Sequence, residues 1–336
     1  HSLSPVFSWP GRHAGRWARL MMQTFRVTDA LRCLVLNTPK SPNLACPRSS
    51  PTKHATLQNL DLWKQALTQQ DNRITRASWN GIRLGGLVSA RTCTGHVWEV
   101  DHLYLPDDQP DINGLSSRLS YGQEAAILEL LEQLVQEAGS RNAERIFLRL
   151  PSGIPAVTLA RRDGFFPYFE ETLMEGWAGN ISHQSEHPAE NIRVRQQQDE
   201  YSLFQLFCAC TPAPVRVVLG LTCDQWQEAM SLRSSKRLEW VIESNGKLVG
   251  WLALFNCRGT IEGQVMAHPD HPELLDQLMT LSSSNPSYQR WLVPDYQQSM
   301  CDQLSYRGLP EAARYTMLVN TVTAPVRCAG MAPVEA

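Results

Sequence analysis

The sequence contains the same order of predicted elements twice, and this repeat constrains the fold more than any other feature. In each copy two strand-like stretches flank an Asn-Gly dipeptide, which is Asn80-Gly81 in the first copy and Asn245-Gly246 in the second. Asn-Gly suits a two-residue hairpin turn, because both turn positions require positive φ. A repeat as long as a domain indicates duplication and not a solenoid of short units.

Hydrophobic spacing predicts that each copy contains three strands, a helix, a strand, a second helix ending at a glycine, and a closing strand. In the first copy these stretches are 73–79, 82–91, 96–105, 123–138, 145–150, 154–162 and the strand from Phe165. In the second copy they are 238–243, 247–255, 260–267, 272–281, 288–293, 296–306 and 315–319. The predicted fold class is therefore α/β, with a mixed sheet of the α+β kind in each of two tandem units.

Breaks in this pattern predict the domain boundaries. The stretch 38–56 is rich in Pro, Ser and Thr and is typical of a loop, and 176–191 is polar without a hydrophobic period and is typical of a linker. We expect a disordered extension at 1–21, a first domain at 22–175, the linker at 176–191, a degenerate second domain at 192–322 and a flexible tail at 323–336.

Composition excludes several function classes. The chain of 336 residues carries 31 Lys and Arg against 33 Asp and Glu, and this net charge of -2 provides no basic field for nucleic acid or an anionic membrane. None of the nine cysteines forms a Cys-x-x-Cys pair, so we expect no metal site. Free thiols and the lack of a membrane-spanning apolar run favour a cytoplasmic protein.

The order of elements resembles that of the GCN5-related N-acetyltransferase (GNAT) superfamily. The segment 156–165, which ends in Gly164-Phe165, is similar to that family's last helix and the Gly-Phe after it, and 305–309 is a weaker copy. The whole arrangement resembles the tandem two-domain proteins of this superfamily. The resemblance implies an acyl-CoA-dependent N-acyltransferase, with acetyl-CoA or another acyl-CoA as cosubstrate and a small-molecule or peptide amine as acceptor. Because the duplication already pairs two units, we expect a monomer.

In that family, a loop after the central strand holds the pyrophosphate of the acyl-CoA with backbone N–H groups at a helix N-terminus. The first copy offers Arg118, Ser120, Tyr121, Gly122 and Gln123 for this role. An ordinary polar loop that enters a helix at Gly122 is an equal alternative. The second copy has no glycine there and has two prolines in 268–272, which lack N–H donors. We therefore expect the cofactor in the first copy.

Acyl transfer to an ammonium group needs a base. Alternation along the third strand places Glu99 and Asp101 on one face, with Trp98, Val100, His102 and Tyr104 on the other. The resemblance implies that the base comes from this strand, so Glu99 and Asp101 are the candidates. The alternative is a pair of solvated or salt-bridged carboxylates.

The same reaction benefits from an acid that protonates the leaving thiolate. The place of the family's acidic tyrosine is taken by Ala160 in the first copy and by Leu304 in the second. Tyr168, just beyond Gly164-Phe165, is a candidate substitute, and core packing is its alternative role.

A second hypothesis belongs to another class: a non-catalytic tandem module that binds an acyl-CoA, another ligand or a partner protein. The two hypotheses differ in what lies between the central strands near 120–124. Convergent N–H groups that face a splay between these strands would favour acyl-CoA binding, whereas side chains that fill the splay would favour the module.

Overall fold

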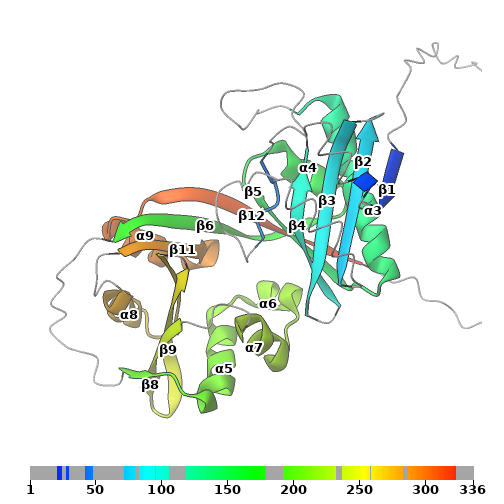
Figure 1. The fold of residues 1–336 in the computed structure, drawn as a ribbon. Helices are drawn as coiled ribbons and strands as arrows, with labels where there is room; N and C mark the ends of the chain where they lie inside the picture. Colours follow the sequence, from blue (N-terminus) through cyan, green and yellow to red (C-terminus); the bar gives the residue numbers. More distant parts are fainter. Residues whose placement is uncertain are drawn as a thin grey trace, which may run out of the picture.

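The computed structural model describes residues 21–24, 28–29, 42–47, 72–80, 83–94, 96–105, 119–178, 192–231, 237–257, 259–282 and 287–322. These residues form one twelve-stranded mixed sheet in the order β1-β2-β3-β4-β5-β12-β6-β11-β10-β9-β8-β7. Most neighbours are antiparallel, and β4–β5 and β10–β11 are the parallel pairs. The two halves of the sheet meet at the long strands β6 and β12 (Figure 1).

The strands are β1 (Met21–Thr24), β2 (Arg73–Asn80), β3 (Arg83–Thr94), β4 (Val97–Tyr104), β5 (Arg145–Pro151), β6 (Phe166–Ala178), β7 (Ile192–Val194), β8 (Arg237–Ser244), β9 (Lys247–Cys257), β10 (Thr260–Ala267), β11 (Ser287–Pro294) and β12 (Glu311–Thr321). The α-helices are α3 (Tyr121–Ser140), α4 (Pro155–Arg162), α5 (Glu200–Cys210), α6 (Ala213–Leu219), α7 (Cys223–Ser231), α8 (Leu274–Ser282) and α9 (Gln298–Tyr306). Short 3-10 helices precede α5 and α9, at Gln197–Asp199 and Asp295–Gln297. Within the described ranges, no helix combines the length and the apolar character needed to cross a membrane.

The mixed α/β architecture predicted from the repeat is confirmed, and the local turn signals explain why. Asn245 and Gly246 have φ of 51° and 75°, as a hairpin turn between β8 and β9 requires. Gly81 of the first predicted turn lies outside the described residues. The two helices that precede the closing strands end at Gly164 and Gly308, with φ of 84° and 86°.

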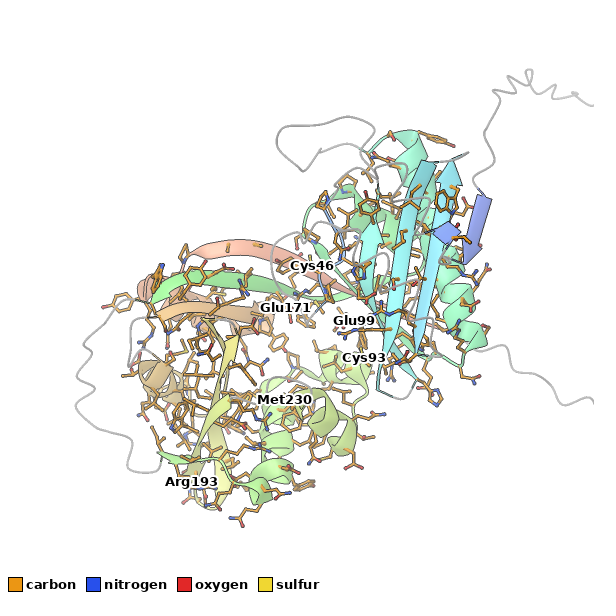
Figure 2. All side chains as sticks on the ribbon, viewed as in Figure 1. Cys46, Cys93, Glu99, Glu171, Arg193 and Met230 are labelled. Carbon is orange, nitrogen blue, oxygen red and sulfur yellow. The ribbon has the colours of Figure 1, made fainter. Side chains whose placement is uncertain are left out.

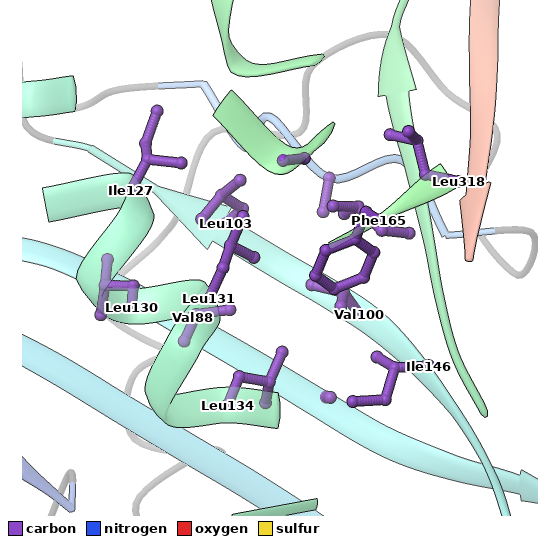
Figure 3. Close-up of a cluster of buried hydrophobic side chains, with 14 of the residues drawn as sticks. Val88, Val100, Leu103, Ile127, Leu130, Leu131, Leu134, Ile146, Phe165 and Leu318 are labelled. Carbon is purple, nitrogen blue, oxygen red and sulfur yellow. The ribbon is translucent and has the colours of Figure 1, made fainter. Parts of the chain in front are cut away.

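The core of the first half lies between one face of the sheet and helices α3 and α4. Helix α3 presents apolar side chains at helical spacing, including Ile127, Leu130, Leu131 and Leu134, and all of them are fully buried. They pack against buried residues of β3, β4 and β5, as Figure 3 shows for Val88, Val100, Leu103 and Ile146. This face of the sheet is therefore closed by the helices.

The two halves exchange their last strands. Strand β12 pairs with β5 and β6, and it brings Leu318 into the core of the first half (Figure 3). Strand β6 pairs in turn with β11, and it brings Met174 and Ala178 into the core of the second half. Because β6 continues to Ala178, the first residues of the predicted linker are strand. The local pattern could not foresee this exchange, since it depends on pairing between distant segments.

The second half is covered on both faces. Helices α8 and α9 close one face over Leu252, Val265 and Trp291, and α5 and α7 close the other over Trp251 and Phe255. Helix α6 also contacts β6 and α7 contacts β3, so these helices lie against the first half as well. The face of the first half opposite α3 and α4 therefore borders the second half.

Candidate functional site

Strand β4 contains a β-bulge at Asp101. Val100 is the register partner of Ala90 and His102 that of Ser89, which leaves Asp101 as the extra residue. The bulge reverses the alternation after it, so Leu103 and Leu105 join Trp98 and Val100 in the core beneath α3. The expectation that His102 and Tyr104 share the face of Trp98 was therefore wrong, because strict alternation assumes an unbroken ladder.

Strands β4 and β5 separate just before this bulge. They are paired only from Val97 to Glu99 and from Arg145 to Phe147. We call the region beyond, where β4 from Val100 to Tyr104 faces β5 from Leu148 to Pro151, the splay. The unpaired backbone groups that border the splay need other partners, because buried N–H and C=O groups are rarely left unbonded.

A distant segment of the chain, residues 42–47, provides these partners. Leu44 donates its backbone N–H to the carbonyl of Leu103 at 2.8 Å, and Cys46 donates its N–H to the carbonyl of Arg149 at 2.9 Å. The segment therefore bonds to β4 on one side and to β5 on the other. We call it the plug, because it occupies the splay between the two strands.

The side chain of Asn43 fixes the plug to the bulge. Its Nδ2 donates to the carbonyl of Asp101 and its Oδ1 accepts from the N–H of Leu103, both at 2.8 Å. Asn43 is 7% exposed, and Ala45 and Cys46 are buried as well. Chain segments fill the splay, which is the arrangement expected of the non-catalytic alternative.

Glu99 and Asp101 are both ion-paired, which is the alternative to a catalytic role. Asp101 Oδ2 lies 2.7 Å from Arg73 Nη1, and Glu99 Oε2 lies 3.0 Å from Arg91 Nη2. Burial alone raises the pKa of Asp101, but His102 and the Arg73 guanidinium outweigh it and hold the pKa below its ordinary value. Asp101 is therefore a weak proton acceptor at neutral pH.

Tyr168 packs among aromatic rings. Its ring centroid is 5.9 Å from that of Phe147, whose backbone is paired with Glu99, and 4.8 Å from that of Phe169. The half-buried ring thus takes part in packing, and its role as an acid stays a prediction.

The predicted pyrophosphate loop forms the N-terminus of α3, and its first turn is a capping box. Ser120 Oγ accepts the N–H of Gln123 at 3.3 Å, and Gln123 Oε1 accepts the N–H of Ser120 at 2.9 Å. These two N–H groups are therefore already bonded within the cap. The N–H groups of Tyr121 and Gly122 stand between them, at the positive end of the helix dipole. Arg118 lies outside the described residues.

A buried cluster at the junction of the two halves was not predicted from the sequence. Arg149 Nη1 lies 3.0 Å from Glu171 Oε2, and its guanidinium carbon lies 4.7 Å from the ring centroid of Tyr315. Cys46 of the plug lies beside them, and burial raises the pKa of its thiol to about 11. Figure 2 labels Cys46 and Glu171 together with Glu99.

A signal for this cluster exists in the sequence. Arg149 stands between apolar residues inside the predicted strand 145–150, and a charge in such a place requires a partner. The sequence does not reveal that this partner is Glu171 or that the plug covers the pair, because three separate strands and a loop have to meet.

In the second half, a cavity is lined by Arg195, Glu239 and Trp251, among other residues, and Arg195 Nη1 lies 3.1 Å from Glu239 Oε1. Trp291 of β11 is fully buried against Gly263 of β10, whose missing side chain leaves room for the indole. At the start of α8, the N–H groups of Leu274 and Leu275 bond to the carbonyls of His271 and Pro272. These two N–H groups are therefore bonded within the turn that begins α8.

No protein-family model matches the sequence, and no curated protein matches it. Among solved structures, a tandem GNAT protein from the clavulanic acid biosynthesis pathway, solved without acetyl-CoA, matches with a TM-score of 0.52 at 11% identity over 91% of this chain and 99% of that chain. A protein of Pyrococcus horikoshii that is proposed to be an acetyltransferase matches with a TM-score of 0.50 at 10% identity over 94% of each chain. These likenesses show that the chain has the tandem GNAT fold.

Proposed function

From the tandem GNAT fold, we propose that the protein is an acyl-CoA-dependent N-acyltransferase that binds its cofactor in the first half. The observation that carries the proposal is the splay beside the Asp101 bulge. The N–H of Leu103 and the carbonyls of Asp101, Leu103 and Arg149 form hydrogen bonds there with the Asn43 side chain and with the backbone of the plug. The pantetheine arm of acyl-CoA carries amide groups, which have the chemistry to use the same positions.

The cofactor's pyrophosphate would lie at the N-terminus of α3, beside Tyr121 and Gly122. The supporting observation is helix α3 itself. It is 20 residues long, and its first turn points N–H groups outward. The Ser120–Gln123 capping box keeps that turn in shape. The fold neighbours with acetyltransferase names are consistent with this use of the fold.

We propose Glu99 as the base in preference to Asp101. Asp101 is held ionised by Arg73 and is a poor proton acceptor, whereas Glu99 stands at the last paired position before the splay. Glu99 would take a proton from the acceptor's ammonium group. The amine nitrogen then forms a bond to the thioester carbon and loses its second proton as the carbon–sulfur bond breaks. The leaving thiolate takes a proton from the candidate donor Tyr168, and the proton lost by the nitrogen replaces it.

The filled splay favours a second candidate, the non-catalytic tandem module. The plug is buried, and it forms hydrogen bonds with both strands. If it never leaves, the first half cannot hold an acyl-CoA between β4 and β5. The fold would then act as a scaffold for another ligand or for a partner protein.

Calorimetric titration with acetyl-CoA and CoA tests the proposal. Gly122→Pro removes one N–H from the first turn, where proline is tolerated. Gly122→Ala is the matched control, since an added Cβ meets no atom closer than Ser120 Oγ at 4.0 Å. We expect binding that Gly122→Pro weakens at least tenfold and Gly122→Ala leaves unchanged. Equal affinity in all three proteins would remove the helix terminus from the site, and no binding at all would favour the module.

A further inference from the structure

We propose that the plug, residues 42–47, is an internal competitor that has to leave the splay before acyl-CoA binds. This inference rests on the function proposed above and adds its regulation. The plug takes up the hydrogen-bonding positions of Leu103, Asp101 and Arg149 that border the splay. A cofactor arm and the plug cannot bond to the same groups at once, so the two exclude each other.

The plug is held by the burial of Ala45 and Cys46 and by polar contacts that a ligand can replace. Asn43 supplies two of them, and the backbone N–H groups of Leu44 and Cys46 supply the others. Each such bond contributes little net free energy, because the alternative partners bond equally well. An extended amide ligand offers the same donors and acceptors.

The plug also leaves hydrogen-bond donors of Arg149 unsatisfied. Arg149 is buried, with its side chain 2% exposed, yet its Nε and Nη2 have no hydrogen-bond partner among the described residues. Buried unsatisfied donors disfavour the state in which they occur. The Cys46 thiol donates to the carbonyl of Leu44, so it does not serve these two nitrogens. A ligand that places a carbonyl or carboxylate oxygen beside Nε or Nη2 would satisfy Arg149 better than the plug does.

The first experiment weakens the plug and measures acetyl-CoA affinity by calorimetry. Asn43→Ala removes the two side-chain bonds to β4 but leaves the backbone of Leu103 and Asp101 intact. We expect the affinity for acetyl-CoA to rise about 5- to 100-fold. In this variant the plug occupies the splay less of the time and therefore competes less with acetyl-CoA. Asn320→Ala is the matched control, since Asn320 is also 7% exposed and bonds to the carbonyl of Asp163, not to the plug.

The second experiment uses the wild-type protein and therefore does not depend on how a variant folds. Alkylation of individual cysteines is followed by mass spectrometry with and without acetyl-CoA. Cys46 is 3% exposed, so we expect slow labelling that acetyl-CoA accelerates at least several-fold as the plug leaves. Cys301 of α9 is the control inside the same molecule, because it is also buried, lies in the second half, and should not respond.

The outcomes separate the two proposals. Tighter binding by Asn43→Ala together with acetyl-CoA-dependent labelling of Cys46 supports the internal competitor. Equal affinity of Asn43→Ala and wild type, with Cys46 still protected when acetyl-CoA is bound, overturns the competitor and leaves the transferase proposal standing. If neither protein binds acetyl-CoA at millimolar concentration, both proposals fail.

Discussion

Leu318 of β12 is the cross-strand partner of Leu148 of β5, although the two residues come from opposite halves of the chain. Both are fully buried in the core beneath α3 and α4. Strand β12 therefore completes the first half, and β6 completes the second by pairing with β11. We propose that the two predicted domains depend on each other for stability.

This dependence predicts the effect of one substitution. Leu318→Ala should destabilise the first half by about 2–4 kcal/mol, because it opens a cavity in a closed core. Amide hydrogen exchange in α3 should accelerate accordingly, although residue 318 lies at the end of the second half. Val217→Ala on the exposed side of α6 is the control, since Val217 is 75% exposed and its loss should change stability by less than about 0.5 kcal/mol. Unchanged exchange in α3 would refute the mutual dependence.

The ion pair of Asp101 with Arg73 predicts a pH-dependent contribution to stability. Asp101→Asn should lower the free energy of unfolding by about 1–3 kcal/mol at pH 7, because it leaves a partly buried guanidinium without its charge partner. The folded pKa of Asp101 is depressed, so its contribution is present above the unfolded value near 3.8 and is lost as pH falls below it. Denaturant unfolding from pH 7 to pH 3 should show wild type and variant converging.

An exposed pair is the control for Asp101. Glu311 lies 3.0 Å from Arg314, with side chains 48% and 52% exposed, so Glu311→Gln should cost less than about 1 kcal/mol at any pH. If Asp101→Asn and Glu311→Gln lower the free energy of unfolding by the same amount, burial does not strengthen the pair of Asp101 and Arg73.

For Asp163 we predict that its contribution to stability depends on pH with the opposite sign to that of Asp101. Burial, with a smaller effect of Glu132, raises its pKa to about 7, and the residue caps the C-terminus of α4, where a carboxylate is unfavourable. A raised folded pKa means that stability is greatest below the unfolded value near 3.8 and is lost as pH rises through about 7. Asp163→Asn should therefore match wild type in Tm near pH 4 and exceed it at pH 8. A difference in Tm that is constant with pH would contradict the raised pKa.

The proposed base predicts a specific kinetic change. Glu99→Gln keeps the shape of the side chain but cannot accept a proton, so turnover should fall at least tenfold while acetyl-CoA affinity stays the same. Thiol release with a panel of amines measures turnover, and calorimetry measures affinity. Glu262→Gln is the matched control. Like Glu99, Glu262 lies at a parallel strand pair and is ion-paired with an arginine, here Arg290, but it belongs to the second half. Unaltered turnover in Glu99→Gln would remove Glu99 from the mechanism.

The sequence by itself determined the repeated elements and their order, but not β1, β7 or the helices α5 to α7. Helix α3 follows from apolar residues at helical spacing, and the β8–β9 hairpin follows from Asn245-Gly246, because these signals act over a few neighbouring residues. The face of Glu99 follows from alternation with Trp98, because both residues precede the bulge at Asp101. The fold class could be derived from the repeat of these local units.

Tertiary structure alone decided the arrangement of the site. The bulge at Asp101 exists only in register with β3, and the bonds of Asn43 to β4 join residues that are distant in sequence. The exchange of β6 and β12, and the contact of Arg149 with Glu171, likewise need strands from different parts of the chain. Such pairings are selected by the burial and hydrogen bonding of the whole sheet, and no single segment encodes them.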